Sequence, residues 1–417
     1  MDLRSQLDRC VRCGMCSQHC PTYALTGDEN ESPRGRIALI RALDSGQIPP
    51  GDTLAEHLDH CTGCRACEAY CPSGVRFGAI MDQTRARHPS SPSATPTPAL
   101  LSLASQPRRL LRLGRWLRQY QRWGLQRVAR GSGLLKRLGL AQQDALLPEL
   151  RKLPRWRQYY PPAGEHRGDV ALFTGCVSNL FDRRTLEASQ RLLNHLGYGV
   201  HVPDAQTCCG AMHLHGGQPD AAGRLAQRNL DAFLPLLDGG RVQAIVHSTS
   251  GCTAMLAEYP HLPSLPAHRQ SEAQRLAERV LDISQFLVAS PELARQQPAP
   301  LAETVAVHSP CSLRNTLHQQ QAPIDLLTRI PDIRLRPLPT NIRCCGGAGS
   351  YMLDQPAFAR RMRQAPLDAV RELDAGILVT SNVGCALHLQ AGLREQGRAV
   401  ELLHPVTLLA RQLALVD

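Results

Sequence analysis

The chain has 417 residues, of which 43% are hydrophobic and 20% charged. This composition is typical of a soluble globular protein of two or three domains, and it excludes general disorder, a collagen-like fibre and a membrane-spanning bundle. No run approaches the roughly 18 consecutive apolar residues of a spanning helix. The net charge is +11, and residues 108–137 alone hold ten Lys or Arg and no Asp or Glu. The excess charge is therefore local.

The sixteen cysteines are the most informative feature. They occur in tight runs or adjacent pairs, a spacing that favours metal chelation over disulfide bridging. No apolar segment that would act as an export signal precedes Cys10. We therefore expect a cytoplasmic protein, because thiols stay reduced in that compartment.

Two runs near the N-terminus have the pattern C-x2-C-x2-C-x3-C-P, first over residues 10–21 and again over residues 61–72. This is the ligand run of a bacterial ferredoxin with two clusters. Three thiolates on one loop reach three irons of a cubane, and the fourth cysteine faces the other cluster. Proline after that cysteine suits a first helical turn.

The runs predict two [4Fe–4S] clusters that share ligands between the motifs. One set is Cys10, Cys13, Cys16 and Cys71; the other is Cys61, Cys64, Cys67 and Cys20. The alternative is a pair of zinc sites, but zinc usually takes its ligands as spaced pairs, which this run fits poorly.

Between the two runs, Ser32-Pro33 predicts the start of an amphipathic helix. Arg34 and Arg36 follow directly. Two interpretations stay open for them: they offset the negative charge of the clusters, or they are solvated residues of a helix start.

Residues 88–98 are rich in Pro and Ser and predict a linker. The basic segment follows, with Leu113, Trp116 and Trp123 at helical spacing and arginines between them. It predicts a basic amphipathic helix. Its apolar face either packs on the protein itself or a partner, or lies on an anionic membrane through residues 108–137. No nucleic-acid motif accompanies the charge, so we expect no nucleic-acid partner.

Residues 166–417 alternate β-rich runs with helical patterns, which indicates βαβ units. The β-rich runs are residues 169–173, 244–246, 304–307 and 376–380. The cysteines repeat within this region at offsets of 135, 136, 136 and 133 residues. The repeated sets are Cys176, Cys208, Cys209 and Cys252, then Cys311, Cys344, Cys345 and Cys385. Each set begins and ends after a β-rich run, and open α/β sheets bind ligands at the carboxyl ends of their strands.

The expected fold is therefore an α+β multidomain protein. A mostly α-helical two-cluster ferredoxin domain covers residues 1–87, and the linker with its basic helical segment covers residues 88–165. Two α/β Cys-Cys-Gly repeats follow over residues 166–300 and 301–417.

The two ferredoxin runs, the Gly27–Arg36 string between them and the two Cys-Cys-Gly repeats together resemble the iron–sulfur subunit of glycolate oxidase. The plan is similar, more distantly, to the iron–sulfur subunits of lactate utilisation, anaerobic glycerol-3-phosphate dehydrogenase and heterodisulfide reductase. The resemblance implies that a separate FAD subunit oxidises a 2-hydroxy acid, most simply glycolate to glyoxylate. This chain would pass the electrons towards quinone or another acceptor.

The resemblance implies that this chain has no catalytic residue and does not turn over substrate without its partner subunit. We find no flavin-binding glycine motif. The Gly346–Gly349 string belongs to the Cys-Cys-Gly loop and predicts a close approach of backbone to a metal site. The lactate, glycerol-3-phosphate and heterodisulfide activities remain alternatives.

In the heterodisulfide reductase relatives, each full repeat has a fifth cysteine. Here Met255 and His388 stand at those positions. Four cysteines per repeat can still hold an iron–sulfur cluster or a zinc ion, or the repeats can be metal-free. His388 is a candidate fifth ligand, whereas Met255 favours core packing. We expect structural roles for His213, His215, His247 and His308.

Overall fold

The computed structural model describes residues 2–88, 102–103 and 106–417. The expected Pro/Ser linker, apart from His88, lies outside these residues. The described N-terminal region is helical. Its helices are α1 Leu3–Asp8, α2 Pro21–Thr26, α3 Pro33–Asp44, α4 Asp52–Asp59, α5 Ala66–Ala69 and α6 Phe77–Arg87.

A small apolar core holds these helices together and includes Leu7, Ile40 and Ile80. The predicted helix start is confirmed: α3 begins at Pro33, and the Ser32 hydroxyl accepts a hydrogen bond from the Gly35 amide at 3.0 Å. Such an N-cap satisfies a backbone donor that the helix itself leaves unpaired. Five cysteines pack in or against this core, so the core positions the two ligand runs.

The first Cys-Cys-Gly repeat contains a five-stranded sheet of order β1-β3-β2-β4-β5, in which only the β1–β3 pair is antiparallel. Its strands are β1 Tyr159–Tyr160, β2 Asp169–Leu172, β3 Gly199–His201, β4 Ile245–His247 and β5 Val280–Asp282. Its helices are α12 Val177–Phe181, α13 Arg183–His195, α14 Ala211–His215, α15 Pro219–Asp238, α16 Ser250–Ala257, α17 Gln270–Ala277 and α18 Ile283–Ala289.

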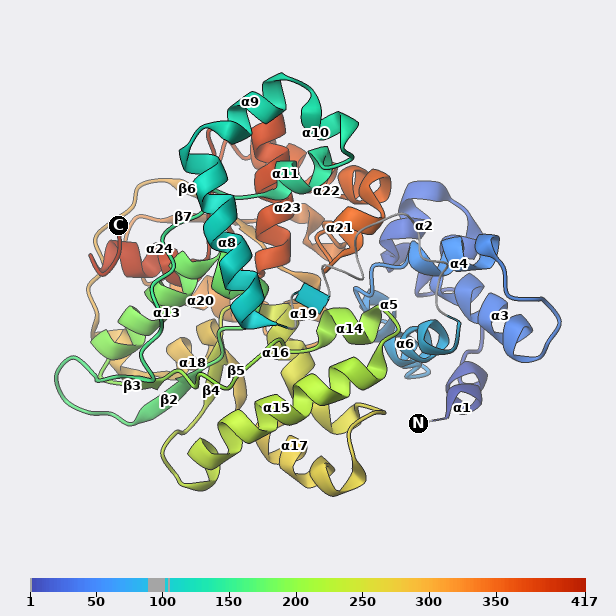
Figure 1. Ribbon diagram of the computed structural model, residues 1–417, viewed down its shortest axis with the longest axis horizontal. Helices are drawn as coiled ribbons and strands as arrows, with labels where there is room; N and C mark the ends of the chain where they lie inside the picture. The colour runs from blue at the N-terminus through green and yellow to red at the C-terminus, as the bar shows by residue number, and fades with distance from the viewer. Residues whose placement is uncertain (1, 89–101, 104–105) are drawn as a thin grey trace.

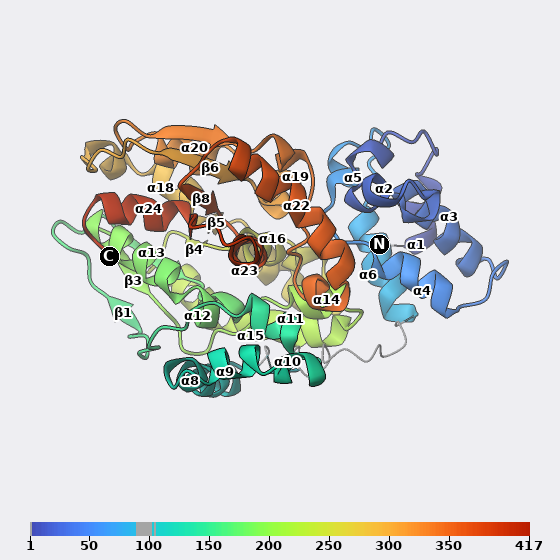
Figure 2. The same cartoon turned by 90° about the horizontal axis from the view of Figure 1, so that it is seen from above.

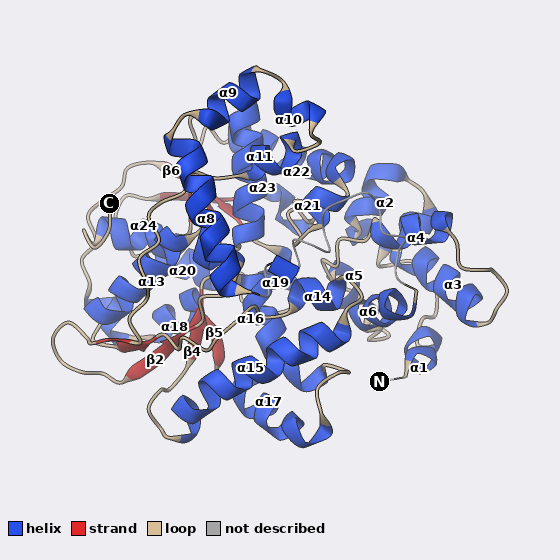
Figure 3. Ribbon diagram, in the orientation of Figure 1, coloured by secondary structure: helices blue, strands red, loops and turns tan. Residues whose placement is uncertain are grey.

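The second repeat contains a parallel four-stranded sheet of order β7-β6-β8-β9. Its strands are β6 Thr304–His308, β7 Arg334–Pro337, β8 Ile377–Thr380 and β9 Glu401–Leu403. Its helices are α19 Cys311–Asn315, α20 Ala322–Leu327, α21 Tyr351–Asp354, α22 Pro356–Glu372, α23 Val383–Glu395 and α24 Pro405–Gln412. The order β3-β2-β4-β5 matches β7-β6-β8-β9 strand for strand, which is the architecture of a duplicated α/β unit. Helices surround the short strands (Figure 3).

One hydrophobic core joins the two repeats. It includes Val170 and Val246 from the first sheet, Val305 and Val379 from the second, and Leu408 from α24. Helices α13 and α18 of the first repeat pack against α24 and α20 of the second (Figure 2). The repeats therefore form one body, beside which the N-terminal helices lie (Figure 1). The expected α+β fold class is confirmed.

From residue 106 onward, a group of helices connects the N-terminal region to the repeats along one edge of the molecule (Figure 2). They are α8 Pro107–Arg122, α9 Leu125–Gly131, α10 Leu134–Arg137 and α11 Ala141–Leu146. The predicted basic helix is thus α8. Among the described residues, no helix combines the length and the apolar character needed to cross a bilayer.

Candidate metal centres

The two ferredoxin-type runs fold into loops with the same backbone. In the first, Arg12 (φ 58°) and Gly14 (φ 82°) flank Cys13; in the second, Gly63 (φ 64°) and Arg65 (φ 58°) flank Cys64. A left-handed conformation on both sides of the central cysteine curls each loop around its thiols. This conformation is uncommon for a residue with a side chain, and such strain gathers at functional sites.

The second loop and one cysteine of the first motif line a common pocket. Cys20, Cys61, Cys64 and Cys67 all face it. Burial raises the pKa of Cys67, and the neighbouring sulfurs of Cys64, Cys61 and Cys20 raise it further. Four thiols around one space are the donor set of a [4Fe–4S] cluster, so the residues present fit the group that their spacing predicts.

The other thiols of the two runs lie nearer the surface. Cys13 is exposed, whereas Cys10, Cys16 and Cys71 pack against the core of the N-terminal helices. Burial raises the pKa of Cys16, the backbone of Arg34 opposes this by hydrogen bonding, and Cys10 adds to the rise. The two groups of four thus differ in depth within the domain.

A buried polar network lies beside Cys20 and Cys61, and the sequence did not reveal it. Glu31 forms an ion pair with Arg36 and accepts hydrogen bonds at 2.7 Å from Nδ1 of both His57 and His60. Arg36 is 1% exposed and also donates to the His57 carbonyl at 2.7 Å. The interpretation of Arg36 as a solvated helix residue is therefore wrong, because its guanidinium is buried.

In the first repeat, all four cysteines meet at the carboxyl ends of β2, β3 and β4. The Cys176 thiol donates to Cys208 Sγ at 3.3 Å, and the Gly210 amide also donates to that sulfur at 3.5 Å. These contacts, with Cys209, lower the pKa of Cys208 well below its usual value. The hydrogen bond from Cys209 and a nearby His247 lower the pKa of Cys252 to about 6 despite burial. Thiolates of this kind bind metal ions.

The second repeat brings its four cysteines together in the same way. Hydrogen bonds from Cys311 and Cys345 lower the pKa of Cys344, to which the Gly346 amide donates at 3.4 Å. Hydrogen bonds to Cys344 and Cys385, together with burial, raise the pKa of Cys345 well above its usual value.

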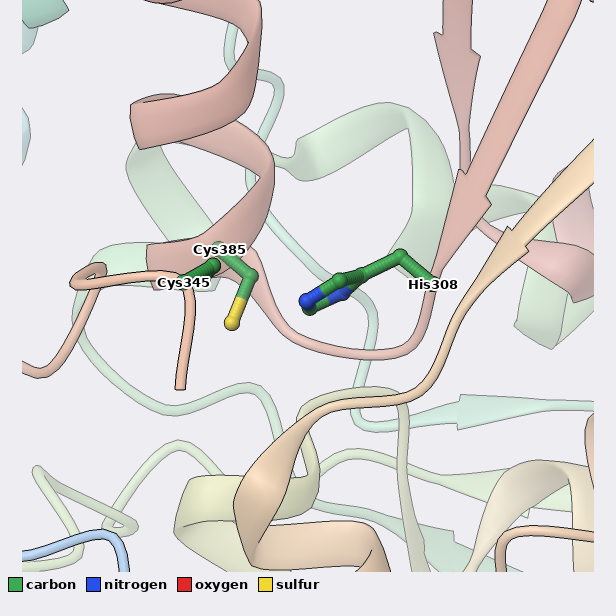
Figure 4. Close-up of side chains that lie close together, drawn as sticks. All are labelled: His308, Cys345 and Cys385. Carbon is green, nitrogen blue, oxygen red and sulfur yellow. The ribbon is translucent and has the colours of Figure 1, made fainter. Parts of the chain in front are cut away.

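One histidine joins the second group. The nitrogen of His308 and the sulfurs of Cys345 and Cys385 all lie within 4.8 Å of one another, and all three residues are buried (Figure 4). Burial lowers the pKa of His308 to about 4, so its imidazole is neutral, the form that binds metal. Nδ1 of His308 lies 2.9 Å from the Thr380 hydroxyl, as expected of a structural histidine. The sequence pattern did not, however, predict its cluster with Cys345 and Cys385. The place of His308 at the end of β6, three residues before Cys311, was the available signal.

The other singled-out side chains point elsewhere. His388 donates from Nε2 to the Ala359 carbonyl at 2.9 Å and does not join the His308 cluster. Met255 is buried in the apolar core of the first repeat, as its type favoured. His213 bonds Gln218, and His215 bonds Asp82 of α6.

The thiols of the second repeat lie next to the pocket of the N-terminal domain. Burial raises the pKa of Cys64, and the sulfur of Cys344 contributes to that rise. Asn315 of α19 donates to the Cys64 carbonyl at 2.8 Å, and the Tyr351 hydroxyl donates to the His60 carbonyl at 2.9 Å. The thiol groups therefore form a series from the exposed Cys13 to the second repeat.

Comparison with known families agrees with this organisation. The model of a 4Fe-4S dicluster domain matches residues 6–75, and that of a cysteine-rich domain matches residues 170–257 and again 305–390. The class is therefore that of iron–sulfur proteins with a dicluster domain and two cysteine-rich domains. A third model, the linker region of the glycolate oxidase iron-sulfur subunit, matches residues 99–147.

Relatives along nearly the whole chain narrow this class. The probable glycolate oxidase iron-sulfur subunit of Bacillus subtilis is 32% identical over 95% of this chain and 92% of its own length. The glycolate oxidase iron-sulfur subunit of Escherichia coli is 32% identical over 95% and 93%. Lactate utilization protein A of Geobacillus kaustophilus is 28% identical over 56% of this chain and 95% of its own length. The chain belongs to the family of glycolate oxidase iron–sulfur subunits.

A solved structure shares the fold. It is that of a hypothetical protein from Helicobacter pylori, with a TM-score of 0.58 at 9% identity, covering 99% of this chain and 74% of that one.

Proposed function

We propose that this chain is the electron-transfer subunit of a flavin-dependent 2-hydroxy-acid dehydrogenase, with glycolate as substrate and glyoxylate as product. The observation that carries the proposal is the series of thiol groups from Cys13 at the surface, through the pocket of Cys64, to Cys344. Relatives along 95% of the chain are named as subunits of glycolate oxidase. We assign no catalytic residue to this chain.

The eight cysteines of the N-terminal runs are the proposed ligands of two [4Fe–4S] clusters, in the two sets that the spacing predicts. When bound, such clusters accept and release single electrons. The protein supplies what surrounds them: the curled loops around Cys13 and Cys64, and the buried ion pair of Arg36 with Glu31 near Cys20.

The cysteines of the repeats are the proposed ligands of a further iron–sulfur cluster or a zinc ion. The second repeat has the stronger case, because His308 adds a neutral imidazole beside Cys345 and Cys385. The pairing of thiols in the first repeat supports the same role there.

The proposed partners are an FAD-containing subunit, which oxidises the hydroxy acid, and quinone or another acceptor, which receives the electrons. We place the complex in the cytoplasm, at the inner face of the membrane. The relatives named for lactate utilisation match about half of this chain, so lactate is the substrate to compare with glycolate.

The test is to purify the full chain without oxygen and measure iron, zinc and acid-labile sulfide per chain, then glycolate oxidation with and without an FAD subunit. We expect about eight irons with equal sulfide, because two cubanes need four each. Iron beyond these eight, or zinc in addition to them, would show that the repeats bind metal and would identify it. Turnover should require the FAD subunit. Zinc without sulfide, or turnover by the chain alone, would overturn the proposal.

A further inference from the structure

The helices that follow the linker have two different faces. On the inner face of α8, Leu110 is buried and Leu117 half-buried, both in a cluster with Leu180 of α12. Gly114 lies between them, at a point where a Cβ would come within 2.2 Å of the Leu180 side chain, so the two helices are in close contact. Gln121 fastens the end of α8 by bonds to the Pro148 carbonyl and the Leu150 amide. The inner face is therefore fully used by the protein itself.

The outer face carries large apolar side chains in water. Trp116 is 71% exposed and Trp123 is 66% exposed. They are seven residues apart, about two helical turns, and so project from the same side of α8. Further exposed apolar side chains follow on α9, α10 and the turn after it: Leu125, Val128, Leu134, Leu138 and Leu140. The helix thus divides its apolar side chains: Leu110 and Leu117 pack on the protein, whereas the two tryptophans face solvent.

The same outer face is strongly cationic. Its exposed basic residues are Arg109, Arg112, Arg115, Arg122, Arg127, Arg130, Lys136 and Arg137. No acidic residue occurs between residues 108 and 143. The next one, Asp144, is buried and accepts from Arg130 and Gln126. Together these exposed apolar and basic residues form what we call the α8–α10 surface.

We propose that the α8–α10 surface binds a bilayer that contains anionic lipids. Tryptophan rings settle at the level of the lipid headgroups, aliphatic side chains enter the boundary of the acyl chains, and arginines attract the anionic headgroups. A nucleic acid would use the arginines but leave the five aliphatic side chains in water. This proposal rests on the proposed function and deepens it by naming the surface that contacts the membrane. Vesicle binding is measured without turnover, so membrane binding and the electron-transfer function can each fail independently.

The position of this surface suits an electron carrier. The inner side of α8 packs in one cluster with Cys176 and Cys208 of the first repeat. The N-terminal helices lie at another end of the molecule (Figure 2). A bilayer under α8–α10 would therefore adjoin the first repeat and leave the exposed loop of Cys13 free for a protein partner.

The first test uses intrinsic fluorescence of the full chain with vesicles of phosphatidylglycerol and phosphatidylcholine. The chain has three tryptophans. The third, Trp156, is held by Asn179 at 3.0 Å and by Arg183 stacked over its ring. We expect a blue shift on adding anionic vesicles, and none in the variant Trp116→Phe/Trp123→Phe, which keeps only Trp156. An equal shift in that variant would overturn the proposal.

The second test is vesicle flotation of Arg112→Gln/Arg115→Gln/Arg122→Gln. Each arginine near an anionic surface is worth a factor of about five, so the triple variant should lose about a hundredfold in vesicle affinity. The matched control is Arg329→Gln/Arg334→Gln/Arg336→Gln, three exposed arginines near α20 and on the strand beside β6, on the opposite side of the molecule (Figure 2).

The control should float like the unmodified chain, because it loses the same net charge elsewhere. Equal loss in both triple variants, binding to pure phosphatidylcholine as strong as to anionic vesicles, or no flotation of the unmodified chain would each overturn the proposal. Tighter binding of single-stranded DNA than of anionic vesicles would do so as well.

Discussion

Glu31 is a buried carboxylate shared by three basic side chains. Burial raises the pKa of Glu31, but hydrogen bonds from His60 and His57 and the charge of Arg36 outweigh it, so the net pKa lies below the usual value. The group is therefore ionised at neutral pH and balances the buried guanidinium. Arg36 also donates to the Thr22 hydroxyl, which lies 3.2 Å from Cys20 Sγ. The ion pair of Glu31 and Arg36 is therefore connected by hydrogen bonds to the thiol pocket.

Replacing Glu31 by Gln should destabilise the protein by about 3–5 kcal/mol, because it leaves the charge of Arg36 buried without a partner. The measurement is denaturation followed by circular dichroism. Glu56→Gln is the control, since that carboxylate is 67% exposed and its contact with His60 is long, at 3.9 Å. Equal stability of the two variants would contradict the role assigned to Glu31.

At the scale of the elements, Gly347 of the second Cys-Cys-Gly loop is needed because the loop packs closely on a helix. A Cβ on Gly347 would lie 2.8 Å from the Gly384 carbonyl oxygen and 3.0 Å from Cys385 Cα. The loop thus lies directly on the start of α23, and this contact brings Cys345 to Cys385. The string was expected to bring backbone close to a metal site; the close contacts in the structure are with α22 and α23.

Gly347→Ala should force this loop away from α23. Overpacking of this kind costs about 1–3 kcal/mol, and the separation of Cys345 from Cys385 should weaken metal binding at the site proposed for the second repeat. Unfolding free energy and metal per chain are the measurements. In Gly51→Ala the new methyl group meets open space, so that control should leave both quantities unchanged. Unaltered stability in Gly347→Ala would refute the contact.

Sequence pattern predicted some of these elements and missed others for physical reasons. The strands β2, β4, β6 and β8 are runs of buried apolar residues and were predicted. The strands β3, β5, β7 and β9, which flank the central pairs β2–β4 and β6–β8, were not predicted. The sequence of β7 is Arg-Leu-Arg-Pro, so no apolar run marks it. The cysteines were found by spacing. His308 and Glu31 were not, because their partners lie far along the chain and only the fold brings them together.

At the scale of the whole molecule, the N-terminal helices dock on both repeats. Arg65, beside Cys64, forms an ion pair with Glu258 after α16, and His215 of α14 bonds Asp82 of α6 at 3.0 Å. Asn315 and Tyr351 provide the contacts to the second repeat. These contacts hold the pocket lined by Cys64 against the second repeat, close to Cys344.

Glu258→Gln should loosen this docking. In protein with eight irons per chain, which leaves no cluster for the repeats, cluster absorbance during unfolding reports on the N-terminal domain, and helical circular dichroism reports mainly on the repeats. The two transitions should coincide in the unmodified chain and separate in the variant, with absorbance lost first, because the charge of Arg65 loses its partner across the junction. Glu278→Gln, an exposed change on the same repeat, should keep them together. Coinciding transitions in Glu258→Gln would argue against a docking role.

The exposure of the loop around Cys13 also determines the order in which the thiols of the protein are oxidised in air. Val11 is 69% exposed and Met15 is 50% exposed on either side of the exposed Cys13, whereas Cys20 and Cys67 are buried. Dioxygen and peroxide reach the outer loop first. Oxidative damage should therefore begin at the thiols of this exposed loop, and repair of that loop alone would restore a damaged molecule while Cys20 and Cys67 are still intact.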